Sequence, residues 1–167
     1  MYPYNLEELK AQVISQLEGR GVHLEDIAEI VMHLQEKYMD YLTLEMCLEH
    51  LDAVLSKREI LHAVMTGLAL DDLANRKLLP EPLQTIVETD EGLYGIDEIL
   101  PLSVVNVYGT IGLTNFGYLD KEKVGIIKEL DARKGKDVTT FTDDLVAALA
   151  AASASRLAHA AQTKEES

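Results

Sequence analysis

Apolar residues recur at spacings of three and four along most of this chain, which is the pattern of helices that bury one face. The first series, within residues 6–17, begins behind Asn5 and Glu8, whose spacing is that of a helix N-terminal capping box. Further series lie within residues 24–38 and 43–55. No stretch alternates between apolar and polar residues over the length of a strand. The pattern therefore predicts an all-α bundle of six to eight helices.

The second half of the chain continues the helical pattern less regularly. Ser56 is the expected N-cap of a helix that carries Gly67 and runs to about Leu79. Residues 96–114 predict a buried helix, broken at Pro101 or Gly109.

Residues 120–131 predict another helix, and an N-cap of that helix is the alternative to a functional role for Asp120. Thr140 or Thr142 is expected to cap an alanine-rich terminal helix, whose small side chains let neighbouring helices approach closely. No linker divides the 167 residues, so we expect one domain over residues 1–167, with amphipathic helices over residues 1–55.

The charge balance excludes some partners. Acidic residues outnumber basic ones 29 to 15, which gives a net charge of −14. Because phosphate backbones require a basic surface, we expect no nucleic-acid partner. Anionic lipid head groups would repel such a chain, so we expect no more than transient contact with a membrane. The sequence shows neither a signal peptide nor an uninterrupted membrane-spanning apolar run, and we expect a cytoplasmic protein, peripheral at the membrane if it meets one.

Four carboxylates lie within residues 90–98, ahead of an apolar run that has no charge until Asp120. Asp97 and Glu98 therefore stand at the mouth of an apolar element. Burying a carboxylate costs several kcal/mol unless a partner compensates it, and a cation is the simplest partner. The alternative is that both residues stay in solvent and favour a helix N-terminus through its dipole. These residues alone leave the two explanations open.

Two more acidic positions lie beside uncharged apolar segments. Asp120 ends the apolar run and is followed by Lys123, while Asp143 and Asp144 open the terminal helix. Each has a simple explanation as a helix cap, but three such clusters in one half of the chain favour a shared cation site. Mg²⁺ prefers oxygen ligands of this kind.

The acidic segments resemble motifs of the phosphatidylglycerophosphatase A family. Residues 90–100 resemble its acidic turn, which contains glycine and leads into an Asp-Glu pair and an apolar helix. Residues 116–123 resemble its Phe-Arg-x-x-Asp-x-x-Lys-Pro segment, and residues 141–147 resemble its closing Asp-Asp-x-x-Ala motif. The resemblance covers residues 57–160 and is greatest for a soluble branch in Gram-positive bacteria that includes the low-temperature requirement C proteins.

This resemblance implies an all-helical, Mg²⁺-dependent phosphatase that removes the terminal phosphate of phosphatidylglycerophosphate or a related phosphomonoester. The implied metal ligands are Asp97, Glu98, Asp120, Asp143 and Asp144. Of these, Asp97, Glu98 and Asp120 are also expected catalytic residues, together with Lys123, which would contact the phosphate of a phosphorylated lipid or small phosphomonoester.

Two departures from the family pattern leave activity open. Gly117 stands where the family has arginine, the natural bidentate ligand of phosphate, and Val124 stands where it has proline. A second hypothesis is therefore a non-catalytic helical protein that binds a metal or phosphate. A third is that every acidic cluster only caps a helix. We also expect a homo-oligomer, because the apolar run over residues 96–119 and the alanine-rich helix exceed what a thin bundle readily hides.

Overall fold

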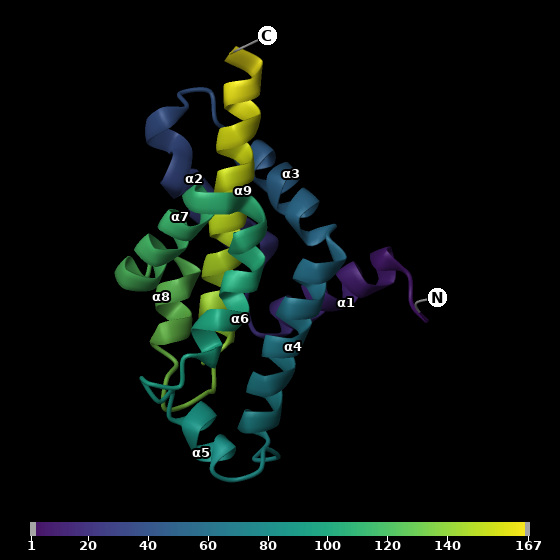
Figure 1. Cartoon of the computed structure of the whole chain (residues 1–167), viewed down its shortest axis with the longest axis vertical. Helices are drawn as coiled ribbons and strands as arrows, with labels where there is room; N and C mark the ends of the chain where they lie inside the picture. Colours follow the sequence, from purple (N-terminus) through teal and green to yellow (C-terminus); the bar gives the residue numbers. More distant parts are fainter. Residues whose placement is uncertain (1–2, 166–167) are drawn as a thin grey trace.

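The computed structural model describes residues 3–165, and within that range the chain forms helices and no strand (Figure 1). The prediction of an all-α, single-domain bundle is confirmed. The α-helices are α1 (Leu6–Gly19), α2 (Leu24–Gln35), α3 (Leu44–Leu55), α4 (Arg58–Asn75), α5 (Leu83–Glu88), α6 (Ile96–Val105), α7 (Gly109–Glu122), α8 (Ile126–Asp131) and α9 (Thr142–Glu165). Short 3₁₀ turns, Glu36–Tyr38 and Asn106–Tyr108, follow α2 and α6.

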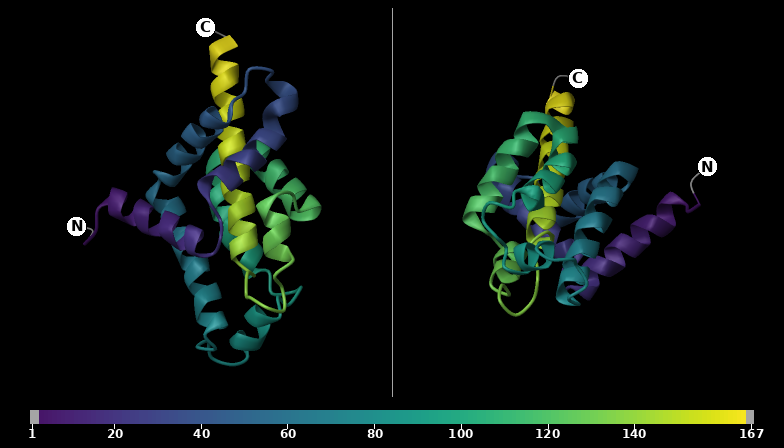
Figure 2. Two further views of the ribbon diagram at one scale, coloured as in Figure 1. Left: turned by 180° about the vertical axis from the view of Figure 1, so that it is seen from behind. Right: turned by 60° about the horizontal axis from the view of Figure 1, so that its bottom comes forward.

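Helix α9 runs through the centre of the bundle, and α2, α3, α6 and α7 pack around it (Figures 1 and 2). Its residues 145–152 are at most 1% exposed, and most of them are alanine. Because alanine side chains are short, the surrounding helices approach the axis of α9 on several sides. The alanine-rich helix therefore forms the core and does not leave an apolar surface, which removes one of the two reasons for expecting an oligomer.

Residues 96–114, which the sequence predicts as one buried helix, differ from that prediction in two ways. It divides into α6 and α7 at Gly109, whose φ of 73° lies in the left-handed region that favours glycine. Figure 1 shows α6 rising along α9 and the chain turning into α7 at this point. The prediction of burial is also wrong, since Ile99 is 60% exposed and Leu113 is 42% exposed. Pro101 lies inside α6 without ending it, so the break falls at Gly109 alone.

By length and composition alone, the segment Ile96–Glu122 could cross a membrane. Its glycines and its proline interrupt the apolar run, which is why the sequence predicts no span there. In the structure only 28% of the most apolar window is buried, and the chain bends within the segment. The expectation that the protein lacks a transmembrane segment stays a prediction.

Several predicted helix ends are wrong. Lys57, not Ser56, is the N-cap of α4, because the Ser56 hydroxyl donates to the carbonyl of Asp52. That helix ends at Asn75, since Lys77 turns the chain with a φ of 58°. Asp120 is not an N-cap but lies in the last turn of α7, because the helix continues through the predicted boundary to Glu122.

Gly67 lies where α4 packs against the start of α9. A Cβ atom at Gly67 would lie 2.4 Å from Cδ1 of Leu145 and 3.2 Å from Cβ of Phe141. Real Cβ atoms do not approach other atoms so closely, so a side chain here would make the end of the Leu145 side chain move and would press on Cβ of Phe141, which is held close to the backbone. The mid-helix glycine, which costs about 1 kcal/mol of helix propensity relative to alanine, is explained by this contact.

We predict that Gly67→Ala lowers the free energy of unfolding by about 1–2 kcal/mol, because overpacking a core typically costs about 1–3 kcal/mol and the propensity gain recovers part of it. Gly117→Ala is the matched control, since Gly117 also lies inside a helix but a Cβ atom there would have no neighbour within 4 Å. Urea denaturation of both variants measures the difference. If the Gly67→Ala protein were as stable as the Gly117→Ala protein, the close contact at Gly67 would not explain the glycine.

Candidate active site

One small pocket, of about 150 Å³, collects the acidic residues of three separate segments. It lies where the loop before α6, the start of α6, the end of α7 and the start of α9 meet. The structure brings together all the candidate site residues that the sequence singles out, and adds others. The residues that line the pocket are Asp90, Gly92, Asp97, Glu98, Asp120, Lys123, Lys134, Asp143 and Asp144.

The start of α6 supplies Asp97 and Glu98. Gly95, with a φ of 73°, turns the chain into the helix, so both carboxylates fall in its first turn. Asp97 is 9% exposed, whereas Glu98 is exposed to solvent. Burial, together with the nearby charge of Asp90, raises the pKa of Asp97, and the backbone N–H groups of the first turn oppose that rise. The two lysines of the pocket form ion pairs with Asp90, Asp120 and Asp143 and not with Asp97. The charge of Asp97 is therefore less compensated than the charges of those three aspartates.

The end of α7 supplies an acidic and a basic residue. Lys123 closes the helix in the left-handed conformation, with a φ of 48°. Its ammonium group lies 3.1 Å from Oδ1 of Asp120, 3.5 Å from Oδ2 of Asp143 and 3.9 Å from Oδ1 of Asp144. Burial alone would lower the pKa of Lys123, but these carboxylates raise it, so the side chain stays charged.

The start of α9 supplies the two most deeply buried carboxylates of the pocket. Asp143 is 2% exposed and Asp144 is 5% exposed. Oδ1 of Asp143 accepts a hydrogen bond of 2.9 Å from the backbone N–H of Asp144, which leaves its Oδ2 directed at the lysines. Burial raises the pKa of both carboxyls, and the Asp143 charge adds to the rise at Asp144. Two adjacent buried carboxylates of this kind call for more positive charge than one lysine provides.

Lys134, from the loop between α8 and α9, supplies a second ammonium group that the sequence analysis missed. It lies 2.6 Å from Oδ2 of Asp90, 2.7 Å from Oδ1 of Asp131 and 3.9 Å from Oδ2 of Asp143. Burial alone would lower its pKa, but the hydrogen bonds to Asp131 and Asp90 raise it. Nothing in the local sequence marks Lys134, because it stands in a polar loop among other basic residues. Asp90 belongs to the acidic cluster of residues 90–98 but is not among the ligands that the family motifs imply.

The donors of the pocket fit a hard cation by type, since its acidic side chains all offer carboxylate oxygens. Among the residues that the structure describes, however, no three acidic, histidine or cysteine side chains stand close enough together to hold a metal as they are. The two lysines keep the carboxylates apart, because the ammonium group of each lies between carboxylates from different segments. A metal would have to replace part of these ion pairs.

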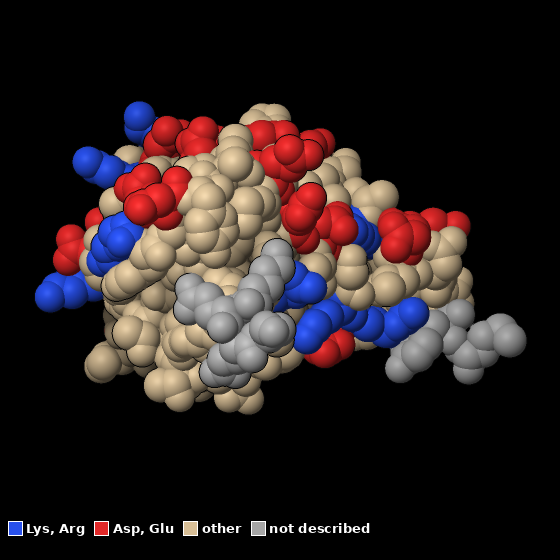
Figure 3. All heavy atoms as spheres, turned by 90° about the horizontal axis from the view of Figure 1, so that it is seen from above, with Lys and Arg blue, Asp and Glu red and all other residues tan. Residues whose placement is uncertain are grey.

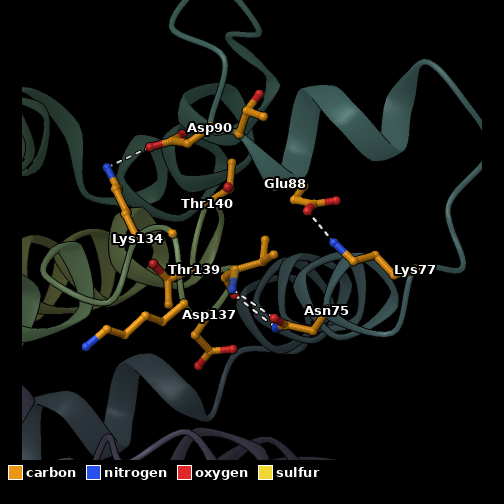
Figure 4. Close-up of a pocket in the computed structure, with 12 residues that line it drawn as sticks. Asn75, Lys77, Glu88, Asp90, Lys134, Asp137, Thr139 and Thr140 are labelled. Carbon is orange, nitrogen blue, oxygen red and sulfur yellow. Dashed lines mark hydrogen bonds and ion pairs between the residues drawn. The ribbon is translucent and has the colours of Figure 1, made fainter.

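A larger groove of about 630 Å³ adjoins this pocket, and Asp90 and Lys134 line both (Figure 4). Figure 4 shows their ion pair on one side of the groove and that of Lys77 and Glu88 on the other. The lining includes two buried polar residues, Thr139 and Thr140. A molecule that placed one end in the acidic pocket would therefore meet a polar groove beside it.

Comparison with known proteins matches residues 13–159 to the family model described as phosphatidylglycerophosphatase A. Over 166 residues the chain is 63% identical to YpjQ, an uncharacterized protein of Bacillus subtilis, and the match covers 99% of this chain and 93% of YpjQ. It is 49% identical over 158 residues to YutG, an uncharacterized protein of the same organism, with 95% of each chain covered.

Solved structures agree in fold. The crystal structure of the low temperature requirement C protein from Listeria monocytogenes superposes with a TM-score of 0.89 at 52% identity, covering 92% of this chain and 97% of that one. The crystal structure of YpjQ gives a TM-score of 0.91 at 64% identity, covering 96% and 99%. The resemblance inferred from the acidic motifs is thereby confirmed, and this chain belongs to the phosphatidylglycerophosphatase A family.

Proposed function

We propose that this protein is a Mg²⁺-dependent phosphatase that acts on phosphatidylglycerophosphate or a related phosphomonoester. Family membership indicates a function related to phosphatidylglycerophosphatase. The observation that carries the finer proposal is the pocket itself, where carboxylates from α6, α7 and α9 meet around Lys123. An anionic phosphate does not enter an acidic pocket unless a cation neutralises it, so the electrostatics themselves favour a metal.

Each residue has a role in this proposal. Asp97, Glu98, Asp120, Asp143 and Asp144 would hold Mg²⁺ through carboxylate oxygens, directly or through water. When bound, the metal supplies positive charge for the phosphate and lowers the pKa of a water molecule. Lys123 and Lys134 would contact phosphate as point charges.

The reaction adds water across the phosphoester bond. The water oxygen bonds to phosphorus, the bond from phosphorus to the leaving oxygen breaks, and that oxygen takes up a proton. In this proposal the proton comes from the attacking water, whose pKa a bound metal would lower.

A lipid substrate is supported by the surface beside the pocket. Ile96, Ile99 and Leu102 form an exposed apolar stripe on α6, at spacings of three, beside Asp97 and Glu98. No residue from Ile99 to Leu119 is charged. Figure 3 shows a broad area free of Asp, Glu, Lys and Arg on one side of the molecule seen from above. We propose that the protein is cytoplasmic and that this stripe meets a membrane transiently or packs against a second copy of the chain.

A water-soluble phosphomonoester is the second substrate class. The groove shared with the pocket supports it, since its lining is largely polar and includes two ion pairs, Lys77 with Glu88 and Lys134 with Asp90. A hydroxylated organic group would find hydrogen-bonding partners there, whereas acyl chains would not. Phosphate release from phosphatidylglycerophosphate and from glycerol 3-phosphate, each with and without Mg²⁺, separates the two classes.

A non-catalytic protein that binds a metal or phosphate is the competing function. It is favoured by Gly117, which stands where the family has arginine and leaves open space at its exposed position on α7. The lysines, which already neutralise part of the acidic cluster, also favour it. Calorimetric binding of Mg²⁺ without release of phosphate from any substrate would support this function over the phosphatase.

We predict that Asp97→Asn keeps the fold but weakens Mg²⁺ binding and reduces phosphatase activity at least about tenfold, because it removes one charge from a hard-cation site while preserving size. Asp40→Asn is the control, since Asp40 is exposed and does not line the pocket. Isothermal calorimetry gives the affinity and circular dichroism the fold. Equal Mg²⁺ affinity in the wild type and the Asp97→Asn variant removes Asp97 from the site.

Lys134→Met should change two affinities in opposite directions. Removing one ammonium group from among the carboxylates should strengthen Mg²⁺ binding, and the same loss should weaken competitive inhibition by inorganic phosphate. Lys136→Met is the matched control from the same loop, because Lys136 is exposed and does not line the acidic pocket. If the Lys134→Met variant binds Mg²⁺ and phosphate as tightly as the Lys136→Met variant does, Lys134 has no part in the site.

Stability should depend on pH through the buried carboxyls. Burial raises the pKa of Asp71 to about 7 and also raises those of Asp97, Asp143 and Asp144. A carboxyl whose pKa is higher in the folded than in the unfolded state destabilises the fold as it ionises, so the free energy of unfolding should fall from about pH 5 to about pH 9.

Mg²⁺ should restore stability most at the upper end of this pH range, where the carboxyls are ionised and bind it best. Thermal melts across pH with and without Mg²⁺ measure the effect, and an Asp143→Asn/Asp144→Asn double variant should flatten both the pH profile and the Mg²⁺ response. A wild-type profile that is flat across pH and indifferent to Mg²⁺ contradicts the prediction.

A further inference from the structure

Asp71 is a buried carboxylate that lies outside the acidic pocket. It stands on α4, is 0% exposed, and none of the pocket-lining positions belongs to that helix. Its place in the sequence indicates no role, because it is one of two adjacent acidic residues within a helical pattern. A carboxylate with no exposure to solvent destabilises the fold unless it accepts hydrogen bonds, so its hydrogen-bond donors indicate its structural role.

Those partners are the backbone and side chain at the very start of α9. Both Asp71 oxygens lie 3.1 Å from the backbone nitrogen of Phe141. Its Oδ2 also accepts from the backbone N–H of Thr142 at 2.8 Å and from the Thr142 hydroxyl at 2.6 Å. Helix N-termini leave N–H groups without partners inside the helix, and a residue at the N-cap usually supplies an oxygen. The Phe141 side chain has no oxygen, so Asp71 supplies it from 70 positions earlier in the chain.

This cap acts directly on the first turn of α9, which carries two site carboxylates. Thr142, which Asp71 binds twice, is followed at once by Asp143 and Asp144. The chain before it is also fixed, since the hydroxyl of Thr140 donates to the carbonyl of Val87 at 2.6 Å. The direction of the first turn therefore depends on the Asp71 carboxylate of α4.

The approach of the two helices makes this contact possible. Gly67 lies one turn before Asp71 on α4, and its missing side chain lets Leu145 and Phe141 pack against the helix backbone. The Phe141 ring is in turn held edge-on against Tyr94, with ring centroids 6.0 Å apart, and Tyr94 belongs to the loop that carries Asp90. The same contact thus joins two of the segments that form the pocket.

We infer that Asp71 is a positioning residue of the proposed metal site, which acts by fixing the first turn of α9 so that Asp143 and Asp144 face the pocket. The inference rests on the proposed function, because it assigns to Asp71 the alignment of two of its metal ligands. Asp71 itself does not line the pocket.

The test compares Asp71→Asn with the wild type in the full chain. The amide keeps the size of the side chain, but its NH₂ group faces N–H and O–H donors and leaves at least one of them without an acceptor. We expect faster hydrogen exchange confined to the amides of residues 141–145 and a Mg²⁺ affinity about tenfold or more lower, as for partners that orient metal ligands. Both are measured well below the melting temperature, so that the protein is folded.

Two further variants separate alignment from loss of stability. Val13→Ala destabilises the buried face of α1, which carries no residue of the pocket, and should leave Mg²⁺ affinity unchanged. Thr142→Val removes only the hydroxyl donor to Asp71 and should show the same effects as Asp71→Asn in smaller measure, even if the Asn variant does not fold. Combined with Asp143→Asn, the Asp71→Asn change should lower Mg²⁺ affinity by less than the two single effects together.

The outcomes are distinct. Unchanged exchange at residues 141–145 in Asp71→Asn or, if that variant does not fold, in Thr142→Val overturns the inference. So does a Mg²⁺ affinity that matches the wild type or falls only as much as in Val13→Ala. If the wild type does not bind Mg²⁺ at all, the proposed function fails, and the exchange at residues 141–145 alone decides whether Asp71 fixes the start of α9.

Discussion

The burial of two adjacent carboxylates at the start of the central helix is the constraint on which this structure depends. Asp143 and Asp144 are each at most 5% exposed, and the cost of burying their charges has to be offset by what surrounds them. Lys123 and Lys134 reach them from α7 and from the α8–α9 loop. These ion pairs bring together parts of the chain that apolar packing alone would not orient. The same ion pairs form the acidic pocket, so they determine both the stability of this end of the bundle and the side chains that the pocket presents.

The fold is largely predictable because most of its helices are specified by residues close together in the sequence. Apolar spacing and the Asn5 cap predict α1, and the side chain of Asn5 does accept from the backbone N–H of Glu8 at 2.7 Å. The alanine-rich stretch predicts a helix that neighbours can approach closely, and α9 is that helix. Where the prediction fails, the deciding forces are not local. Apolarity alone predicts that residues 96–114 are buried, but α9 accepts only one face of α6 and of α7.

The candidate site is predictable in part for a related reason. Aspartates that precede or end uncharged apolar segments are conspicuous, and Asp97, Asp120 and Asp143 stand in such places. Their convergence follows from helix ends meeting at one end of a bundle. Lys134 has no such mark, since a lysine in a polar loop is ordinarily solvated and only the path of the loop brings it to Asp90 and Asp143.

The two lysines bear on the competing functions of the pocket. As the structure stands they neutralise carboxylates, so in the proposed function a metal and the lysines would compete for the same oxygens. A phosphate ion would resolve that competition, because it would offer new acceptors to the lysines while the metal bound the carboxylates. Metal and phosphate should therefore bind cooperatively in this pocket, and each alone should bind more weakly. A pocket with this property is suited to a substrate that arrives with its cation, which is why we favour a phosphatase over a protein that only senses a metal.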